Sequence, residues 1–203
     1  MAVAVVAGIG AGVASVLSGH HGSQAAVGGS GAAQQQAAPQ SASPQSSSPG
    51  TSTERAQLAQ VTPQIRQSAS ARSTVVTATQ GVGACAMAPS KGIRLMNQAI
   101  NERRAVITRL GTLPVTAVPG GQQLLADFKR VLRQSIRADR GFIGWMQDIQ
   151  NSGTCPVNTT TNSSYQAGVR ASRQANSAKH SFLGRWNPLA SRFGQPRYRA
   201  SHI

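Results

Sequence analysis

Residues 122–155 constrain the fold most strongly, because they form the longest run with a clear helical period. Their apolar side chains recur at spacings of three and four, which places them on one face of a helix. These side chains are Leu125, Phe128, Val131, Leu132, Ile136, Phe142, Ile143, Met146 and Ile149. The sequence Asn-Ser-Gly at 151–153 then ends the pattern. A helix with such a wide apolar face needs other elements to cover it.

Three further segments show helical patterns and supply those partners. Residues 54–80 carry a moderate apolar stripe, in which Pro63 predicts a kink or a later start. Residues 90–112 form a firmer helix, and a fourth covers about 163–183 or runs on to Arg192. Short loops separate the segments. We therefore expect an all-α fold, an antiparallel up-down four-helix bundle that follows a disordered N-terminal linker.

The two cysteines, Cys85 and Cys155, fall in the first and third of the predicted inter-helix loops. In an up-down bundle these loops lie at the same pole, so the topology brings the two sulfur atoms together. Their spacing does not match a zinc site or a redox motif. We expect a disulfide that closes a loop of about 70 residues and stabilises the fold by roughly 4 kcal/mol. Disulfides persist outside the reducing cytosol, so the pair indicates export.

The N-terminal quarter differs from the rest, because every charged side chain lies at Glu54 or later. Residues 1–18 are apolar and predict an export signal or membrane anchor, although their uncharged run Ala2–Leu17 spans as a helix only about 24 Å of a ~30 Å hydrocarbon core. The alternative is a flexible Ala/Gly tail. Residues 19–53 are rich in Gly, Ser, Gln and Pro and predict a disordered linker. Residues 54–203 then form a basic helical domain.

The net charge of +15 results from 20 lysines and arginines against 5 acids. Such a charge attracts polyanions: nucleic acid, an anionic membrane surface or a phosphate-bearing cell-wall polymer. Arginines near the C-terminus are the candidate polyanion contacts, namely Arg185, Arg192, Arg197 and Arg199. A solvated basic tail is the favoured interpretation of this stretch, and a specific binding site is the alternative. No helix-turn-helix, RNA-binding or zinc-finger pattern accompanies it, so nucleic acid is the less favoured partner.

The inventory of reactive side chains argues against an enzyme. There are only five acids, and no GxSxG, HExxH, P-loop or dinucleotide motif occurs. We predict no catalytic, cofactor or metal site. The large aromatic residues Phe142, Trp145 and Trp186 are expected to anchor the core, with a ligand groove at Trp186 as the alternative.

Asp139 is an exception to the apolar stripe, because it falls between Ile136 and Ile143. A buried carboxylate needs a partner. Helix heights counted from the disulfide pole put Arg72 and Arg173 level with it, so we predict an inter-helix ion pair with one of them. The alternative is a carboxylate in water at the edge of the stripe.

The motifs INERRAVITRLGTLPV, ADRGFIGWM, SGTCP and RWNPLASRFGQP lie within residues 95–203. This region, just over half of the chain, resembles a family of uncharacterised actinobacterial membrane-anchored or secreted proteins. The resemblance implies an apolar N-terminus and a Pro/Ser linker ahead of a helical domain with two cysteines. It implies no activity.

Together these patterns predict a non-enzymatic, membrane-tethered or secreted extracytoplasmic domain that binds a protein partner, an anionic envelope polymer or another ligand. The membrane contact is made by the apolar N-terminal segment. The alternative is a basic polyanion-binding protein, which would bind nucleic acid if the chain stays in the cytoplasm.

Overall fold

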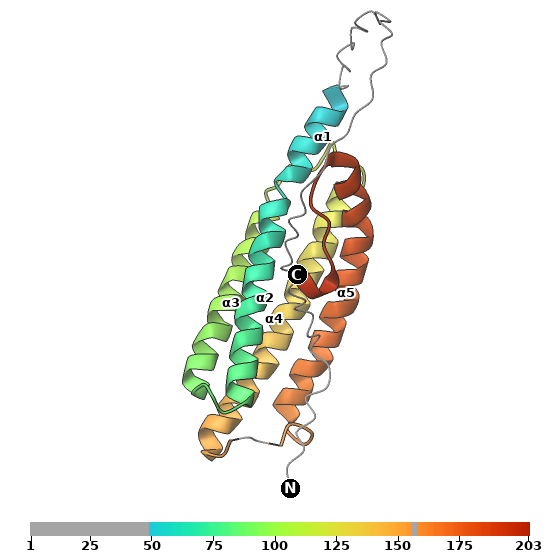
Figure 1. The fold of residues 1–203 in the computed structure, drawn as a ribbon. Coiled ribbons are helices and arrows are strands. Elements are labelled where there is room, and N and C mark those ends of the chain that lie inside the picture. Colours follow the sequence, from blue (N-terminus) through green and yellow to red (C-terminus); the bar gives the residue numbers. More distant parts are fainter. Residues whose placement is uncertain (1–48, 156–157) are drawn as a thin grey trace, which may run out of the picture. The chain divides into compact units, whose positions relative to one another are not determined.

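The computed structural model describes residues 49–155 and 158–203, and there it confirms the all-α bundle (Figure 1). The predicted apolar segment 1–18 and most of the predicted linker lie outside the described residues. The elements in chain order are α1 (Pro49–Ala59), α2 (Thr62–Gly83), α3 (Pro89–Arg109), α4 (Gly121–Ser152), α5 (Ser163–Phe193) and the short 3-10 helix η1 (Ala200–His202). The helices α1 and α2 follow one another along the first rod of the bundle, and α3, α4 and α5 form the other three.

The break between α1 and α2 confirms the kink predicted from Pro63. Helix α1 ends at Ala59, and α2 restarts at Thr62 with the proline in its first turn. Proline lacks the N–H that an uninterrupted helix would need there. Helix α1 begins at Pro49, ahead of the predicted linker boundary at residue 53. Proline suits the first position of a helix, where its missing N–H has no helical partner.

Helix α4 is the central element, since it packs on both α3 and α5. Its predicted end is confirmed: Ser152 is its last residue, and Gly153 caps it in the left-handed conformation (φ 63°). The contact with α5 is close at Gly141 and Gly168. A Cβ atom on Gly141 would lie 2.4 Å from the backbone nitrogen of Gly168, so only glycine allows the two backbones to approach this closely.

The core consists of two hydrophobic clusters, one toward the disulfide end and one toward α1. The disulfide-end cluster contains Ala78, Val82, Met96, Ala138, Phe142, Trp145, Met146 and Ile149. The distal cluster is larger and is built around Phe128, Phe182 and Trp186, with Leu58 and Ile65 from the first rod. Phe142, Trp145 and Trp186 are all buried, which confirms them as core anchors.

The fourth side of the bundle is closed in an unexpected way. In the described part, α2 packs mainly on α3 and α5 mainly on α4. The chain turns back at Gly194 (φ 68°), and residues 195–203 lie between α2 and α5 (Figure 1). We call these residues the C-terminal segment. The segment is therefore not a free tail, because Ile203 is only 1% exposed and joins the distal cluster, although Arg197 and Arg199 are exposed as predicted for a solvated basic stretch.

None of the helices among the described residues combines the length and the apolar character that crossing a bilayer requires.

Candidate binding site beside the C-terminal segment

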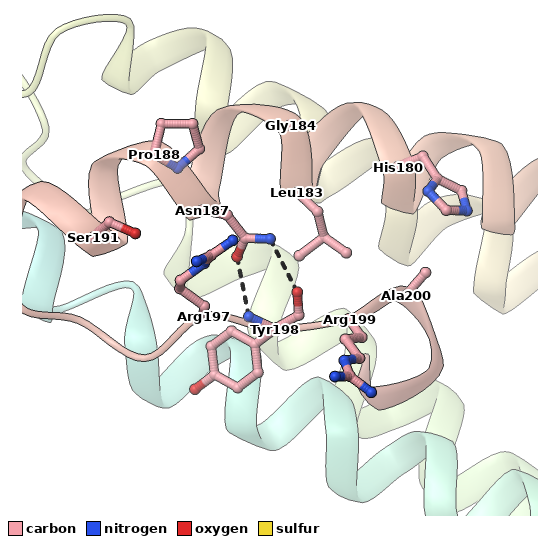
Figure 2. Close-up of a pocket in the computed structure, with 10 residues that line it drawn as sticks. All are labelled: His180, Leu183, Gly184, Asn187, Pro188, Ser191, Arg197, Tyr198, Arg199 and Ala200. Atoms are coloured by element: carbon pink, nitrogen blue, oxygen red, sulfur yellow. Dashed lines mark hydrogen bonds between the residues drawn. The ribbon is translucent and has the colours of Figure 1, made fainter. Parts of the chain in front are cut away.

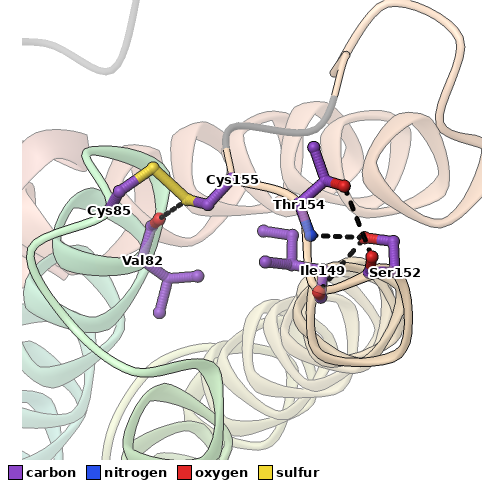
Figure 3. Close-up of a disulfide and its surroundings, with 6 residues drawn as sticks. All are labelled: Val82, Cys85, Ile149, Ser152, Thr154 and Cys155. Atoms are coloured by element: carbon purple, nitrogen blue, oxygen red, sulfur yellow. Dashed lines mark hydrogen bonds between the residues drawn. A yellow bond between two sulfur atoms is a disulfide. The ribbon is translucent and has the colours of Figure 1, made fainter.

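A disulfide joins two inter-helix loops at one end of the bundle (Figure 3). Cys85 follows α2 and Cys155 follows α4, and their sulfur atoms are bonded at 2.08 Å with the Cα atoms 5.9 Å apart. The predicted pairing of the first and third loops is therefore present in the structure. The backbone of Cys85 adopts the left-handed conformation (φ 58°), which turns the chain out of α2 and toward α3.

A buried ion pair lies between the two hydrophobic clusters. Asp139 of α4 accepts a hydrogen bond from the guanidinium of Arg103 on α3, and these residues are 2% and 4% exposed. An ion pair at Asp139 was expected, but both predicted partners are wrong. Arg173 lies exposed on α5, and Arg72 of α2 donates from Nε to the carbonyl oxygen of Ser201 at 3.0 Å. The prediction compared only positions along the bundle axis, which put Arg72 and Arg173 level with Asp139. It did not consider α3, which packs directly on α4.

The sequence did contain a signal for Arg103. The apolar stripe of α3 runs through Met96 and Ile100 to Ile107, and Arg103 occupies the same face, three residues after Ile100. A cation on one stripe and an acid on the stripe of the adjacent helix would have predicted the pair.

Two further basic side chains extend the ion pair into what we call the polar layer: Arg72, Arg103, Asp139 and Lys179. Burial raises the pKa of Asp139 to about 6, although Arg103 and Lys179 act to lower it. Burial also lowers the pKa of Lys179 to about 7, and the charges of Arg72 and Arg103 lower it further while Asp139 raises it. Burial and the charge of Arg103 lower the pKa of Arg72. The layer thus combines three bases with a single acid.

The polar layer and α5 hold the C-terminal segment. Lys179 Nζ donates to the carbonyl oxygen of Ala200 at 3.4 Å, beside the bond from Arg72 to Ser201. Toward the distal end, the indole Nε1 of Trp186 donates to the carbonyl oxygen of Pro196 at 2.9 Å.

The Asn187 side chain makes the most specific contact with the segment (Figure 2). Its Nδ2 donates to the carbonyl oxygen of Tyr198, and its Oδ1 accepts from the backbone N–H of Tyr198, both at 3.0 Å. One amide thus satisfies both backbone polar groups of one residue. A ligand groove at Trp186 was the less favoured prediction; Trp186 itself is buried in the core, and Asn187 and Pro188 after it line an open depression.

This groove runs between α5 and the C-terminal segment and is an open depression of about 620 Å³ (Figure 2). It is lined by His180, Leu183, Gly184, Asn187, Pro188, Ser191, Arg197, Tyr198, Arg199 and Ala200. His180, Arg197 and Arg199 are exposed, and none of the lining side chains is an acid. The rim of the groove is therefore basic and suited to an anionic group.

Only two of the four arginines predicted as polyanion contacts meet at this groove, Arg197 and Arg199. Arg185 instead pairs with Asp127 at 2.7 Å. Arg192 lies 4.0 Å from Glu54, and its guanidinium stacks over the ring of Phe193. Arg185 and Arg192 therefore each have an acidic neighbour, although both side chains are more than half exposed.

Among the described residues, no three side chains of the types that bind metals gather in one place. The arrangement at the groove offers hydrogen-bonding groups and positive charge. Comparisons of this chain with protein-family models, with curated proteins and with solved structures each give no match. The resemblance to actinobacterial secreted proteins therefore stays a prediction.

Replacing Arg103 by methionine should lower the free energy of unfolding by about 3–5 kcal/mol near pH 8, because it leaves the carboxylate of Asp139 buried without its partner. The matched change Arg173→Met, on an exposed side chain, should stay within about 0.5 kcal/mol of the parent. Urea unfolding followed by circular dichroism measures both. Equal losses in the two variants would contradict the assignment of Arg103.

The polar layer also predicts how stability depends on pH. The pKa of Lys179 falls from 10.5 to about 7 on folding, so between these values the unfolded chain binds the proton more tightly and stability rises with pH. The pKa of Asp139 rises from 3.8 to about 6, so its contribution falls as pH increases through that window. The polar layer therefore contributes least to folding stability between about pH 6 and 7, where Asp139 and Lys179 both carry charge.

Lys179→Met should remove the part of the pH dependence that lies above pH 7, because methionine keeps the apolar stem and has no titrating group. As the pH increases from 7 to 10, we expect the unfolding free energy of the parent to increase relative to that of the variant. Urea unfolding at several pH values measures it. A difference that stays constant over this range would show that Lys179 keeps its proton in the folded chain.

Proposed function

We propose that this chain is a non-enzymatic interaction domain of an extracytoplasmic compartment, and that it binds an anionic partner at the groove beside α5. The observation that carries the proposal is the rim of the groove, where His180, Arg197 and Arg199 are exposed and no acid is present. Positive charge on a concave surface attracts anions and orients them. The lining residues of the groove supply hydrogen-bond donors and positive charge, which suit the binding of an anion.

The disulfide supports the location outside the cytoplasm. A cross-link between Cys85 and Cys155 is kept in an oxidising compartment and lost to reduction in the cytosol. The apolar segment 1–18 and the linker-like composition of the residues after it fit a domain tethered to, or released from, a membrane. The proposed membership in a family of secreted or membrane-anchored actinobacterial proteins agrees with this location.

The partner is proposed to be an anionic envelope polymer or an acidic protein. Nucleic acid is the second candidate, and the net charge of +15 is the observation in its favour. Binding that rests on phosphate contacts alone weakens steeply with salt. Retardation of DNA or RNA that persists at about 200 mM salt would favour this second candidate.

The redox state of the thiols in cells tests the proposed compartment. We expect that alkylation of the chain in its native host, followed by mass spectrometry, labels both cysteines only after a reductant is added. Labelling of Cys85 and Cys155 without reductant would place the chain in a reducing compartment and would contradict the extracytoplasmic assignment.

Binding of inorganic polyphosphate tests the groove. The double variant Arg197→Ser with Arg199→Ser should bind polyphosphate at least about tenfold more weakly, a difference of about 1.4 kcal/mol. Isothermal titration calorimetry at about 150 mM salt measures the affinity. The matched control changes Arg133 and Arg137 to serine, because both are exposed on α4 and the charge change is the same. If both double variants lose the same affinity, the net charge acts as a whole and the groove is not the site.

A further inference from the structure

The polar layer holds more positive than negative charge in the interior of the bundle. Each of the four rods supplies one residue: Arg72 from α2, Arg103 from α3, Asp139 from α4 and Lys179 from α5. Arg103 and Lys179 are buried, and Arg72 is half-buried. Lys179 interacts electrostatically with the other three, so the four side chains lie close together. When all four are charged, three cations share a single carboxylate.

The three cations also have more hydrogen-bond donors than their present partners use. The bonds described above engage one nitrogen of each: Nη1 of Arg103, Nε of Arg72 and Nζ of Lys179. An arginine carries five N–H groups and a charged lysine three. The Nε of Arg103 is the clearest case, because it is buried and bonds to no acceptor in the described part of the chain. A buried donor without an acceptor costs free energy, which a bound anion would recover.

The excess of buried positive charge can be relieved in two ways. Lys179 can release its proton, and burial together with the charges of Arg72 and Arg103 lowers its pKa to about 7. Alternatively, an anion can bind in the layer and leave all three cations charged. Release of the proton does nothing for the Nε of Arg103, whereas an anion pairs with the positive charge and also accepts hydrogen bonds. The donors of the layer therefore favour an anion.

We propose that the polar layer is a binding site for a small monovalent inorganic anion such as chloride, with Arg103, Lys179 and Arg72 as its donors. Burial of the first two favours a compact ion, because a polymer would have to open the bundle to reach them. A divalent oxyanion would lose more hydration free energy on burial. This site is separate from the rim of the groove and does not depend on the proposed function.

The site couples the binding of an anion to the binding of protons. As the pH falls, Lys179 gains a proton near pH 7, and Asp139 loses its negative charge near pH 6. Both changes make the layer more positive. The arginines beside them, Arg72 and Arg103, keep their charge over this range, and His202 on η1 is exposed to solvent. Anion affinity should therefore increase as the pH falls.

The first test compares the full disulfide-bonded chain in about 150 mM sodium chloride and about 150 mM sodium gluconate. The two salts have the same ionic strength, but gluconate is too large for a buried site. If the layer binds chloride with a Kd of about 10 mM, chloride at pH 6 should increase the folding equilibrium constant about 16-fold. The thermal unfolding midpoint, followed by circular dichroism, should then be higher by about 3 °C or more. At pH 9 the chloride affinity should be at least about tenfold weaker, because Lys179 is then neutral.

The Lys179→Met variant tests the donor itself, because methionine keeps the apolar stem and cannot bind an anion. This variant should lose most of the difference between the two salts. The matched control is Arg173→Met, which removes an exposed cation from the same helix and should keep the difference. Broadening of the chloride-35 NMR line measures the binding directly. It should be lost in Lys179→Met and kept in Arg173→Met.

Three results would overturn the site. Equal midpoints in chloride and gluconate at pH 6 would show that Lys179 relieves the excess charge by releasing its proton. Equal losses in Lys179→Met and Arg173→Met would show that chloride acts on the net charge of the surface. A chloride affinity that is the same at pH 6 and pH 9 would exclude Lys179 as a donor. The double variant Arg197→Ser with Arg199→Ser should keep the chloride effect, so this proposal and the proposed function can fail separately.

Discussion

The fold depends on how the bundle accommodates charge in its interior. Arg103 and Asp139 pair between α3 and α4, and Lys179 and Arg72 lie nearby from the other two rods. Each buried cation must find an acceptor, because a buried charge without one is costly. The single carboxylate cannot serve all three bases. Buried Lys179 and half-buried Arg72 instead donate to backbone carbonyls of the C-terminal segment, which connects the segment to the polar layer.

Most of the architecture could be predicted from periodicity. The apolar stripe of α4, the proline in the first turn of α2 and the glycine after Ser152 each determine local structure through backbone sterics or burial, which act within a few residues. The disulfide followed from topology, since alternating helices bring the first and third loops to one pole. Such predictions succeed because they need only the direction of each helix and not its rotation about its own axis.

The site was harder to predict because it depends on that rotation. Height along the bundle placed Arg72 and Arg173 level with Asp139, but the partner is the arginine whose side chain faces the neighbouring helix. The C-terminal segment has no helical period, and its arginines made it resemble a solvated tail. Its determinants are an isolated Ile203, which is buried, and an asparagine on α5 that pairs with the backbone of Tyr198. Single side chains of this kind produce no repeating pattern in a sequence.

The position of the disulfide has a mechanical consequence. Cys85 directly follows α2, and Cys155 precedes α5 by a short loop, so the covalent link limits the separation of these two helices at one end only. The close glycine contact between α4 and α5 keeps that pair together as a unit. Any separation of α2 from α5 would therefore be smallest at the sulfur atoms and would grow toward the opposite end of the two helices.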